Sequence, residues 1–362
     1  MSLPYRTKQK IHRISKTVGI VALIALISWF CWTTWAQRYV VYSKDGAKVD
    51  FTLENLDGSG TVAQQPVAQG DVSIYYNEGS AAVDTQKTLS KLDGYYISYD
   101  IMSKDMQGVL NNLQYLQAGT PVMIELKGGY GSFYYSSKLD DAVMASSINI
   151  SEVDNLIDEL KNRGFYLIAK VSSLADYNFG NAYPTTSGLY VPDGAGNYRY
   201  LWMDSAGFYW LNPSSTTTLN WITNVIMELK SKGFNEVMLA NFRFPDSDQY
   251  RFTGDKAAAL ASAAATLYTS CKADNFVLSF GVADATLPLP EGRTRLYFEN
   301  MDAKDISGIK DQAALEDADA RLVVVAPTND SRYNVYGILR PLQQAAAWEA
   351  QKSAMSGVEG EE

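Results

Sequence analysis

One stretch of sequence decides the fold because it occurs twice, as ELKNRGFYLIA at residues 159–169 and as ELKSKGFNEVML at residues 228–239. Apolar residues at helical spacing run up to each copy, from Ile150 in the first and from Leu219 in the second. Each copy ends this helix at a glycine and continues from a phenylalanine into an apolar strand. A helix that leads directly into a strand, used repeatedly, predicts an α/β domain with a parallel sheet.

The same alternation extends outward from these two copies. Strands are predicted at 95–99, 121–126, 165–171, 236–242, 276–280, 296–298 and 321–325, and helices at 106–116, 150–160, 219–229 and 255–271. About seven strands over roughly 250 residues favour a (β/α)8 TIM-like barrel, with an open doubly wound sheet as the alternative. In the barrel, the strands at 121–126, 165–171 and 236–242 would be parallel neighbours. The glycines at 128, 129 and 131 open no helix, so a dinucleotide-binding loop is not indicated.

The N-terminal region carries the pattern of a membrane anchor. Residues 17–35 contain no charged residue and are long enough to cross a bilayer as a helix. Three tryptophans gather near the end of this run, at Trp29, Trp32 and Trp35. Five bases and no acid precede it, which predicts a cytoplasmic N-terminus and a single-pass protein of the cell membrane with an extracellular main domain. A cleaved signal peptide is the alternative.

Charge limits the partners of the part beyond the anchor. The chain has 31 bases and 40 acids, and five of the bases lie before the anchor, which leaves a net charge of −14 after it. Nucleic acid is therefore not an expected partner, because its recognition depends on basic contacts to phosphate.

The chain divides by pattern into five segments. We expect a basic tail at 1–16, a transmembrane helix at 17–36, a β-hairpin with a linker at 37–70, the barrel at 71–341, and a C-terminal helix with an acidic tail at 342–362. The hairpin is predicted from strands at 39–42 and 49–53 that flank the turn residues Lys44, Asp45 and Gly46.

Composition also limits the chemistry. The only histidine, His12, lies in the basic tail, so the main domain can contain neither a Ser-His-Asp triad nor a histidine-ligated metal. The two cysteines are Cys31, within the predicted anchor, and Cys271, so the main domain has no internal disulfide. No cofactor or metal is expected, and any catalysis must use carboxylates, lysine, arginine, tyrosine or serine.

Function in such a barrel lies at the C-terminal ends of the strands. The polar residues at those ends are Asp100, Glu125, Lys127, Lys170, Asn241, Arg243, Asp284, Glu299 and Asp330. Glu125 is the strongest candidate, because a carboxylate within an apolar strand needs a partner or a cavity. The alternative is a structural ion pair of Glu125 with Lys127, Lys170 or Arg243. Asp100, Asp284 and Glu299 also fit helix caps or exposed loop residues.

A long aromatic loop follows the third predicted strand. It holds Tyr177, Tyr183, Tyr190, Tyr198, Tyr200, Trp202, Tyr209 and Trp210. Long loops of barrels often carry function, and exposed aromatic rings stack on sugars. The alternative is that Trp202 and Trp210 fill a small core beneath the loop.

Two segments resemble a known family. They are YLWMDSAGFYWLNP at residues 200–213 and KGFNEVMLANFRFP at residues 232–245. They are similar to the motifs W-(V/L)-D-P and G-F-D-E-I-Q-F-D-Y-I-R-F-P of a bacterial family of glycoside-hydrolase-like TIM-barrel domains, distantly similar to the α-amylase clan. Residues 122–127, VMIELK, resemble its V-V-I-D-V-K strand. The resemblance covers about residues 93–282 and implies a TIM barrel that acts on carbohydrate.

Several acids of that family are replaced here. Ala240 and Asn212 stand at positions of family aspartates, and Gly128 and Gly129 at positions of the acids after the lysine, whereas Glu125 keeps an acid. The resemblance ends near Val282, so the rest of the barrel is expected to be irregular or incomplete.

The sequence therefore predicts a membrane-anchored extracellular domain that binds glycan with weakened or lost catalysis. Predicted catalytic residues are Glu125, Asp284 and Glu299, and predicted sugar-binding residues are Asp100, Tyr130, Lys170, Trp202, Trp210, Asn241 and Arg243. The alternatives are an active carbohydrate hydrolase that uses Glu125 and a second acid, and a scaffold for protein partners.

Overall fold

A computed structural model describes residues 40–43, 46–49 and 89–358, except 314, 316 and 329. The chain divides into two compact units, residues 1–78 and 79–362, which are described separately. In the first unit, β1 (Val40–Ser43) pairs antiparallel with β2 (Gly46–Val49), and Val40 lies opposite Val49. The predicted hairpin is present, but its second strand begins at Gly46 and not at Val49.

The predicted membrane helix at 17–36 and the predicted linker lie outside the described residues. Within the described part of the chain, no helix combines the length and the apolar character that a bilayer crossing requires.

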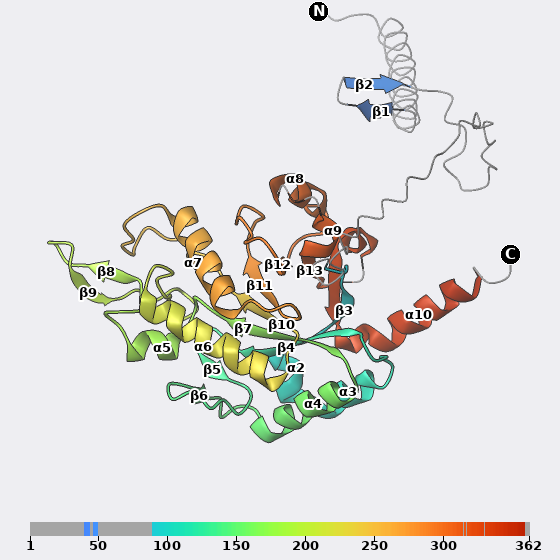
Figure 1. Ribbon diagram of the computed structural model, residues 1–362, viewed down its shortest axis with the longest axis horizontal. Coiled ribbons are helices and arrows are strands. Elements are labelled where there is room, and N and C mark those ends of the chain that lie inside the picture. Colours follow the sequence, from blue (N-terminus) through green and yellow to red (C-terminus); the bar gives the residue numbers. More distant parts are fainter. Residues whose placement is uncertain are drawn as a thin grey trace, which may run out of the picture. The chain divides into compact units, whose positions relative to one another are not determined.

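Eight parallel strands form a closed barrel in the second unit (Figure 1). Their order around the barrel is their order in the chain, and pairing of the first strand with the second and with the last closes the ring. The strands are β3 (Asp93–Ile97), β4 (Pro121–Lys127), β7 (Tyr166–Ser172), β10 (Glu236–Ala240), β11 (Val277–Val282), β12 (Thr294–Glu299), β13 (Leu322–Val325) and β14 (Gly337–Pro341). The predicted barrel is confirmed, as is the parallel pairing of β4 with β7 and of β7 with β10.

Helices cover the first half of the barrel more completely than the second. The main ones are α2 (Tyr99–Lys104), α3 (Met106–Leu113), α4 (Ile150–Asn162), α6 (Thr216–Lys232) and α7 (Lys256–Cys271). Shorter pieces, α8 (Ile309–Ala313) and α9 (Ala318–Arg321), lie between β12 and β13. Residues 283–293 join β11 to β12 without a helix, because Pro288 and Pro290 disfavour one. The irregularity expected after Val282 therefore affects the helices, and the strands are complete.

The two repeated sequence joints fold alike. Gly164 follows α4 with φ of 74° and Gly233 follows α6 with φ of 100°, a left-handed conformation that glycine adopts without strain. One face of α6 buries Trp221, Ile222 and Leu229 against the sheet. Burial of each such side chain contributes about 1.5–3 kcal/mol. In each joint, the glycine that ends the helix and the apolar face that packs on the sheet together direct the chain from the helix into the next strand.

The inside of the barrel has an apolar middle layer. It consists of inward side chains from six of the eight strands: Met123, Ile168, Met238, Tyr297, Val323 and Leu339. Side chains alternate between the two faces of a strand, so the next inward residues form one polar layer below this apolar layer and one above it.

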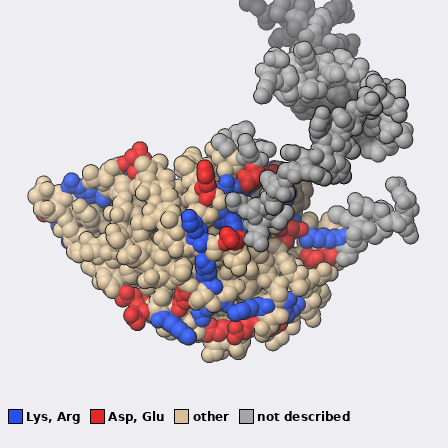
Figure 2. Space-filling view, in the orientation of Figure 1, with Lys and Arg blue, Asp and Glu red and all other residues tan. Residues whose placement is uncertain are grey.

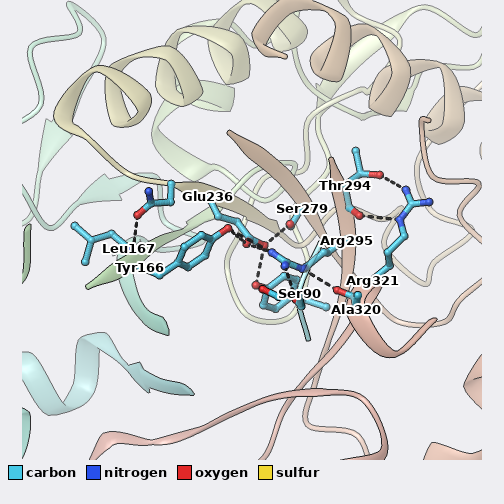
Figure 3. Close-up of polar contacts among 11 residues, drawn as sticks. Ser90, Tyr166, Leu167, Glu236, Ser279, Thr294, Arg295, Ala320 and Arg321 are labelled. Atoms are coloured by element: carbon cyan, nitrogen blue, oxygen red, sulfur yellow. Dashed lines mark hydrogen bonds and ion pairs between the residues drawn. The ribbon is translucent and has the colours of Figure 1, made fainter. Parts of the chain in front are cut away.

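The lower polar layer, at the N-terminal end of the strands, is a closed network around Glu236 (Figure 3). Glu236 forms an ion pair with Arg295 and accepts hydrogen bonds from Tyr166 at 2.9 Å and Tyr297 at 2.8 Å. Ser279 also donates to this carboxylate. Arg295 donates further to the carbonyl of Ser90 at 2.9 Å. We call this cluster the base network.

The eighth strand, β14, was not predicted. It carries Gly337, Arg340 and Pro341 and so lacks the apolar run of the other strands. Arg340 is buried, forms an ion pair with Asp93 and lies over Trp348, with its guanidinium carbon 3.9 Å from the ring centroid. Trp348 belongs to α10 (Ala345–Val358), the predicted C-terminal helix, which is held against β3 where Tyr95 donates to Glu349 at 2.7 Å.

The long loop after β7 contains α5 (Tyr177–Ala182) and an antiparallel hairpin of β8 (Tyr190–Pro192) and β9 (Tyr198–Leu201). The hairpin reaches out at one end of the barrel unit, on the left in Figure 1, and α10 lies at the other end. After β4, residues 128–131 lead into β5 (Ser132–Phe133), which pairs with β4 and with β6 (Val143–Met144).

Candidate functional site

The upper polar layer lies at the C-terminal mouth of the barrel and surrounds a cavity of about 150 Å³. Glu125 on β4, Lys170 on β7 and Glu299 on β12 line this cavity, with Met123 of the apolar middle layer and Val325 of β13 beside them. Glu125 and Lys170 are direct partners in the register of β4 and β7. We call Glu125, Lys170 and Glu299 the mouth triad.

Lys170 forms an ion pair with Glu299. Burial disfavours the charged ammonium group, but the carboxylates of Glu299 and Glu125 outweigh burial and raise the pKa of Lys170 above its usual value. Lys170 therefore stays protonated across the physiological range, and it acts as a fixed cation between two carboxylates.

Glu125 is held in place by the segment after β3. The backbone N–H of Tyr99 donates to its carboxylate at 3.1 Å. The ring of Tyr99 stacks on Tyr134 with a centroid distance of 4.4 Å. Burial and the nearby charge of Glu125 raise the pKa of Tyr134, so its phenol remains a neutral donor. These contacts position Glu125 and leave it facing the cavity.

Two asparagines at the mouth have a left-handed backbone. Asn241 follows β10 with φ of 56°, and Asn300 follows β12 with φ of 58°. Within the described residues these are the only non-glycine positions with positive φ. Such a conformation costs about 1–3 kcal/mol and is often found at functional sites. Asn300 lines the mouth cavity, whereas Asn241 donates to Ser172 at 2.9 Å.

The other predicted ion-pair partners of Glu125, Lys127 and Arg243, contact other residues. Lys127 is buried in an ion pair with Asp176 at 2.8 Å and donates to the carbonyl of Ser172. The guanidinium of Arg243 lies over Trp210, 4.9 Å from the ring centroid. Of the three alternatives, only Lys170 lies beside Glu125.

Asp100 and Asp284 are not part of the mouth triad. The predicted strand at 95–99 ends at Ile97, because Ser98 caps the helix α2. Asp100 therefore lies in α2, where it pairs with Lys104 at 2.6 Å and is exposed. Asp284 accepts hydrogen bonds from Thr286 within its own turn and lines a separate cavity of about 110 Å³ with Arg243. Of the predicted acids, the structure brings together only Glu125 and Glu299.

The predicted aromatic residues divide into buried and exposed ones. Trp210 is buried and donates from its indole N–H to Asp204 at 2.8 Å, as the alternative interpretation proposed. Trp202 is also largely buried, but its edge lines a second cavity. Tyr130 is exposed, and its ring contacts Phe208 edge-on at 4.9 Å.

Three residues of the mouth were not predicted: Tyr96, Tyr134 and Asn300. Tyr96 lies on the inward face of β3, two residues before Ser98. Because every second residue of a strand points to the same face, the alternation of side chains along β3 could have predicted it. Asn300 directly follows Glu299. Tyr134 had no signal in the sequence, because β5 is only two residues long and Tyr134 lies just beyond it.

The packing around the mouth explains two of the replaced acids. A Cβ atom at Gly128 would lie 2.2 Å from the hydroxyl of Tyr134, and one at Gly129 would lie 2.8 Å from the ring of Phe208. Side chains from elsewhere thus fill the space that acids would need. Ala240 is buried inside the barrel at the end of β10, so an acid at this position would face the barrel interior. Asn212 instead caps the turn before α6 by accepting from Ser214.

Within the described residues, no group of three or more histidine, cysteine, aspartate or glutamate side chains is arranged to hold a metal ion.

Comparison with known proteins gave a family match over residues 94–275, to the model of a family described as "Putative glycosyl hydrolase domain". The search of curated proteins found no match. Among solved structures, a hypothetical protein from Ruminiclostridium thermocellum matches with 17% identity and a TM-score of 0.43, over 52% of this chain and 96% of that one.

Two glycoside hydrolases are also similar. The GH20 exo-β-N-acetylglucosaminidase from Vibrio harveyi has 10% identity and a TM-score of 0.45, over 66% of this chain and 42% of that one. α-L-Fucosidase isoenzyme 2 from Paenibacillus thiaminolyticus has 10% identity and a TM-score of 0.42, over 73% of this chain and 50% of that one. The chain thus spans about half the length of these two enzymes.

Proposed function

The chain belongs to this family of glycosyl hydrolase domains, and we propose that its barrel binds carbohydrate at the mouth without hydrolysing it. The observation that carries the proposal is the position of Lys170, which pairs with Glu299 and neighbours Glu125 in the cavity. The two acids that hydrolysis would need are both next to one cation.

Hydrolysis of a glycosidic bond normally requires one carboxyl group that gives a proton and a second one that stays ionised. Lys170 neighbours Glu125 and pairs with Glu299, so both acids of the cavity already have a charged partner. Ala240 supplies no third acid at the end of β10.

The same arrangement suits the binding of hydroxyl groups. Carboxylates accept hydrogen bonds from sugar hydroxyls, and an ammonium group donates to them. Hydrogen bonds with a charged partner contribute about 1.5–3 kcal/mol each. Tyr96 lines the same cavity and adds an aromatic ring beside these groups.

We test the proposal with the full-length protein, purified in a detergent without a sugar head group, on an array of neutral and acidic glycans. Lys170→Met should weaken binding about 10- to 100-fold, because charge-assisted hydrogen bonds are lost. Lys104→Met is the matched control, since Lys104 also pairs with an acid but is exposed on α2. Equal binding by wild type and Lys170→Met would contradict a mouth site.

An active hydrolase is the second candidate, because Glu125 and Glu299 line one cavity. Paired carboxyl groups about 5–10 Å apart are the arrangement that glycoside hydrolysis uses. This candidate predicts measurable turnover that disappears in Glu125→Gln, a near-isosteric change that removes the exchangeable proton.

We further propose that residues 17–35 form a membrane anchor and that the barrel unit lies on the outer side of the cytoplasmic membrane. The uncharged apolar run and the five bases before it support this topology. Protease added to intact cells should remove the part after Trp35 and leave the basic tail protected. Detection of an N-terminal tag on unpermeabilised cells would contradict the topology.

A further inference from the structure

A second cavity, of about 550 Å³, lies away from the mouth in the aromatic loop. It is lined by residues of the β8–β9 hairpin, the end of α5, and the segments around Tyr209 and Gln249. None of its lining residues lines the mouth cavity. We call it the hairpin groove. Its volume is within the range of small-molecule binding sites, about 300–1,000 Å³.

The hairpin groove has an aromatic wall. Tyr198, Tyr200 and Trp202 line it at every second position along β9 and just beyond, which is the spacing of one strand face. Tyr200 is 51% exposed and Tyr198 is 37% exposed, although both rings are apolar over most of their area. Exposed aromatic rings gathered in one cavity indicate an interaction site.

The polar groups of the hairpin groove carry no charge. Its lining includes the amides of Asn181 and Gln249 and includes no lysine, arginine, aspartate or glutamate. Figure 2 shows the same trend on the surface, since the end of the barrel unit that carries the hairpin is mostly tan, with a small blue area near its tip and a small red area at its upper edge. The guanidinium of Arg199 lies 5.5 Å from the ring centroid of Tyr200, but the residues that line the groove offer no charge of their own, so the lining fits a neutral ligand.

The walls of the groove are fixed by contacts outside it. Tyr209 stacks on Tyr177 with a centroid distance of 4.9 Å and an interplanar angle of 9°. The hairpin is tied to the following loop by Arg251, whose backbone N–H donates to Tyr190 and whose guanidinium donates to Gly196, both at 2.8 Å. A ligand would therefore meet preformed walls, which lowers the entropic cost of binding.

We propose that the hairpin groove is a second carbohydrate site, which takes a segment of a neutral oligosaccharide chain. The apolar faces of its sugar rings stack on Tyr198 and Tyr200, and its hydroxyl groups bond to the amides of Asn181 and Gln249. This inference rests on the proposed function in that the ligand is carbohydrate, but it uses different residues. Proline-rich peptides also bind aromatic grooves, and they are the competing occupant.

The test is calorimetric titration of the full-length protein, in a detergent without a sugar head group, with neutral hexasaccharides of β-1,4-linked glucose and of β-1,4-linked N-acetylglucosamine. Tyr200→Ala should weaken binding about tenfold, because a stacked ring is lost. Tyr200→Phe keeps the ring and should bind nearly as wild type. Tyr115→Ala is the matched control, since Tyr115 is 50% exposed but lies after α3.

The outcomes separate the groove from the mouth. Binding that is weakened in Tyr200→Ala and unchanged in Lys170→Met supports the groove and argues against the mouth site. Binding that is weakened only in Lys170→Met overturns the groove and leaves the proposed function standing. Failure of the wild type to bind either hexasaccharide, or binding of a decaproline peptide that Tyr200→Ala abolishes, also overturns the groove as a sugar site.

Discussion

The two polar layers inside the barrel contain the same chemistry in different settings. Each pairs a glutamate with a cation from a strand that is not its neighbour in the sheet: Glu236 with Arg295 in the base network, and Glu299 with Lys170 in the mouth triad. At the base both side chains are buried, with 0% and 2% of their area exposed. At the mouth the exposed fractions are 27% for Glu299 and 20% for Lys170.

The difference lies in whether the pair is enclosed. The base carboxylate is surrounded by an arginine, a serine and two tyrosines, and it is fully buried. The mouth pair lines a cavity that a ligand can enter. We therefore expect the enclosed pair to contribute to stability, and the binding role proposed for the mouth depends on the open side of its pair.

The largest effect is expected at the base. Glu236→Gln leaves the buried charge of Arg295 without its partner and should lower the free energy of unfolding by about 3–5 kcal/mol. Urea denaturation followed by near-UV circular dichroism measures this loss. Ser279→Ala removes only one donor and serves as the milder control, expected to cost about 1 kcal/mol. If Glu236→Gln lowers the free energy of unfolding by less than Ser279→Ala does, the stabilising role assigned to the base network is wrong.

A smaller effect on stability is expected at the mouth. Lys170→Met should change the free energy of unfolding by about 1 kcal/mol or less, because the two acids it leaves remain partly hydrated. The same denaturation experiment measures it, alongside glycan binding. A loss as large as that of Glu236→Gln would assign the mouth triad to stability and remove the basis for a binding site.

The strained backbone of the mouth can be tested at Asn300. Asn300→Ala should lower the free energy of unfolding by about 0.5–1 kcal/mol, because alanine tolerates positive φ poorly, and Asn300→Gly should be neutral or slightly stabilising. Thermal unfolding of the two variants side by side gives the sign. If Asn300→Ala is the more stable of the two, the left-handed conformation of Asn300 is not present in solution.

The smallest effect concerns the attachment of α10. Although burial opposes it, the cations of Lys352 and Arg340 lower the pKa of Asp93 below its usual value of 3.8. A depressed folded pKa means that Asp93 contributes stability above about pH 4 and that this contribution is lost as the pH falls through the folded pKa. Asp93→Asn should therefore make the midpoint of thermal unfolding less dependent on pH in the acidic range. The same pH dependence as in the wild type would contradict the stabilising role of the ion pairs of Asp93.

Much of the fold was predictable because local sequence patterns mark its helices and strands. The glycine stops at 164 and 233 and the apolar strands after them gave the order of elements and the parallel sheet. The strand β14 was missed because its buried Arg340 depends on distant partners, the carboxylate of Asp93 and the ring of Trp348. Local propensity gives no sign of such a strand.

The site was less predictable because its residues are far apart in the chain. Glu125 stood out as a carboxylate within an apolar strand, but 129 residues separate Lys170 from Glu299, and only closure of the barrel brings them together. Trp210 was predicted to bind sugar, but its indole N–H donates a hydrogen bond to Asp204, six positions earlier. Composition cannot tell a buried aromatic ring from an exposed one.

The most direct test of the account measures new reducing ends during long incubation of the wild type with a glycan that it binds. A mouth triad held by Lys170 predicts saturable binding with no reducing ends above those of a sample without protein. Turnover by the wild type that disappears in Glu125→Gln, with binding and fold retained, would contradict the account and identify the barrel as an active hydrolase.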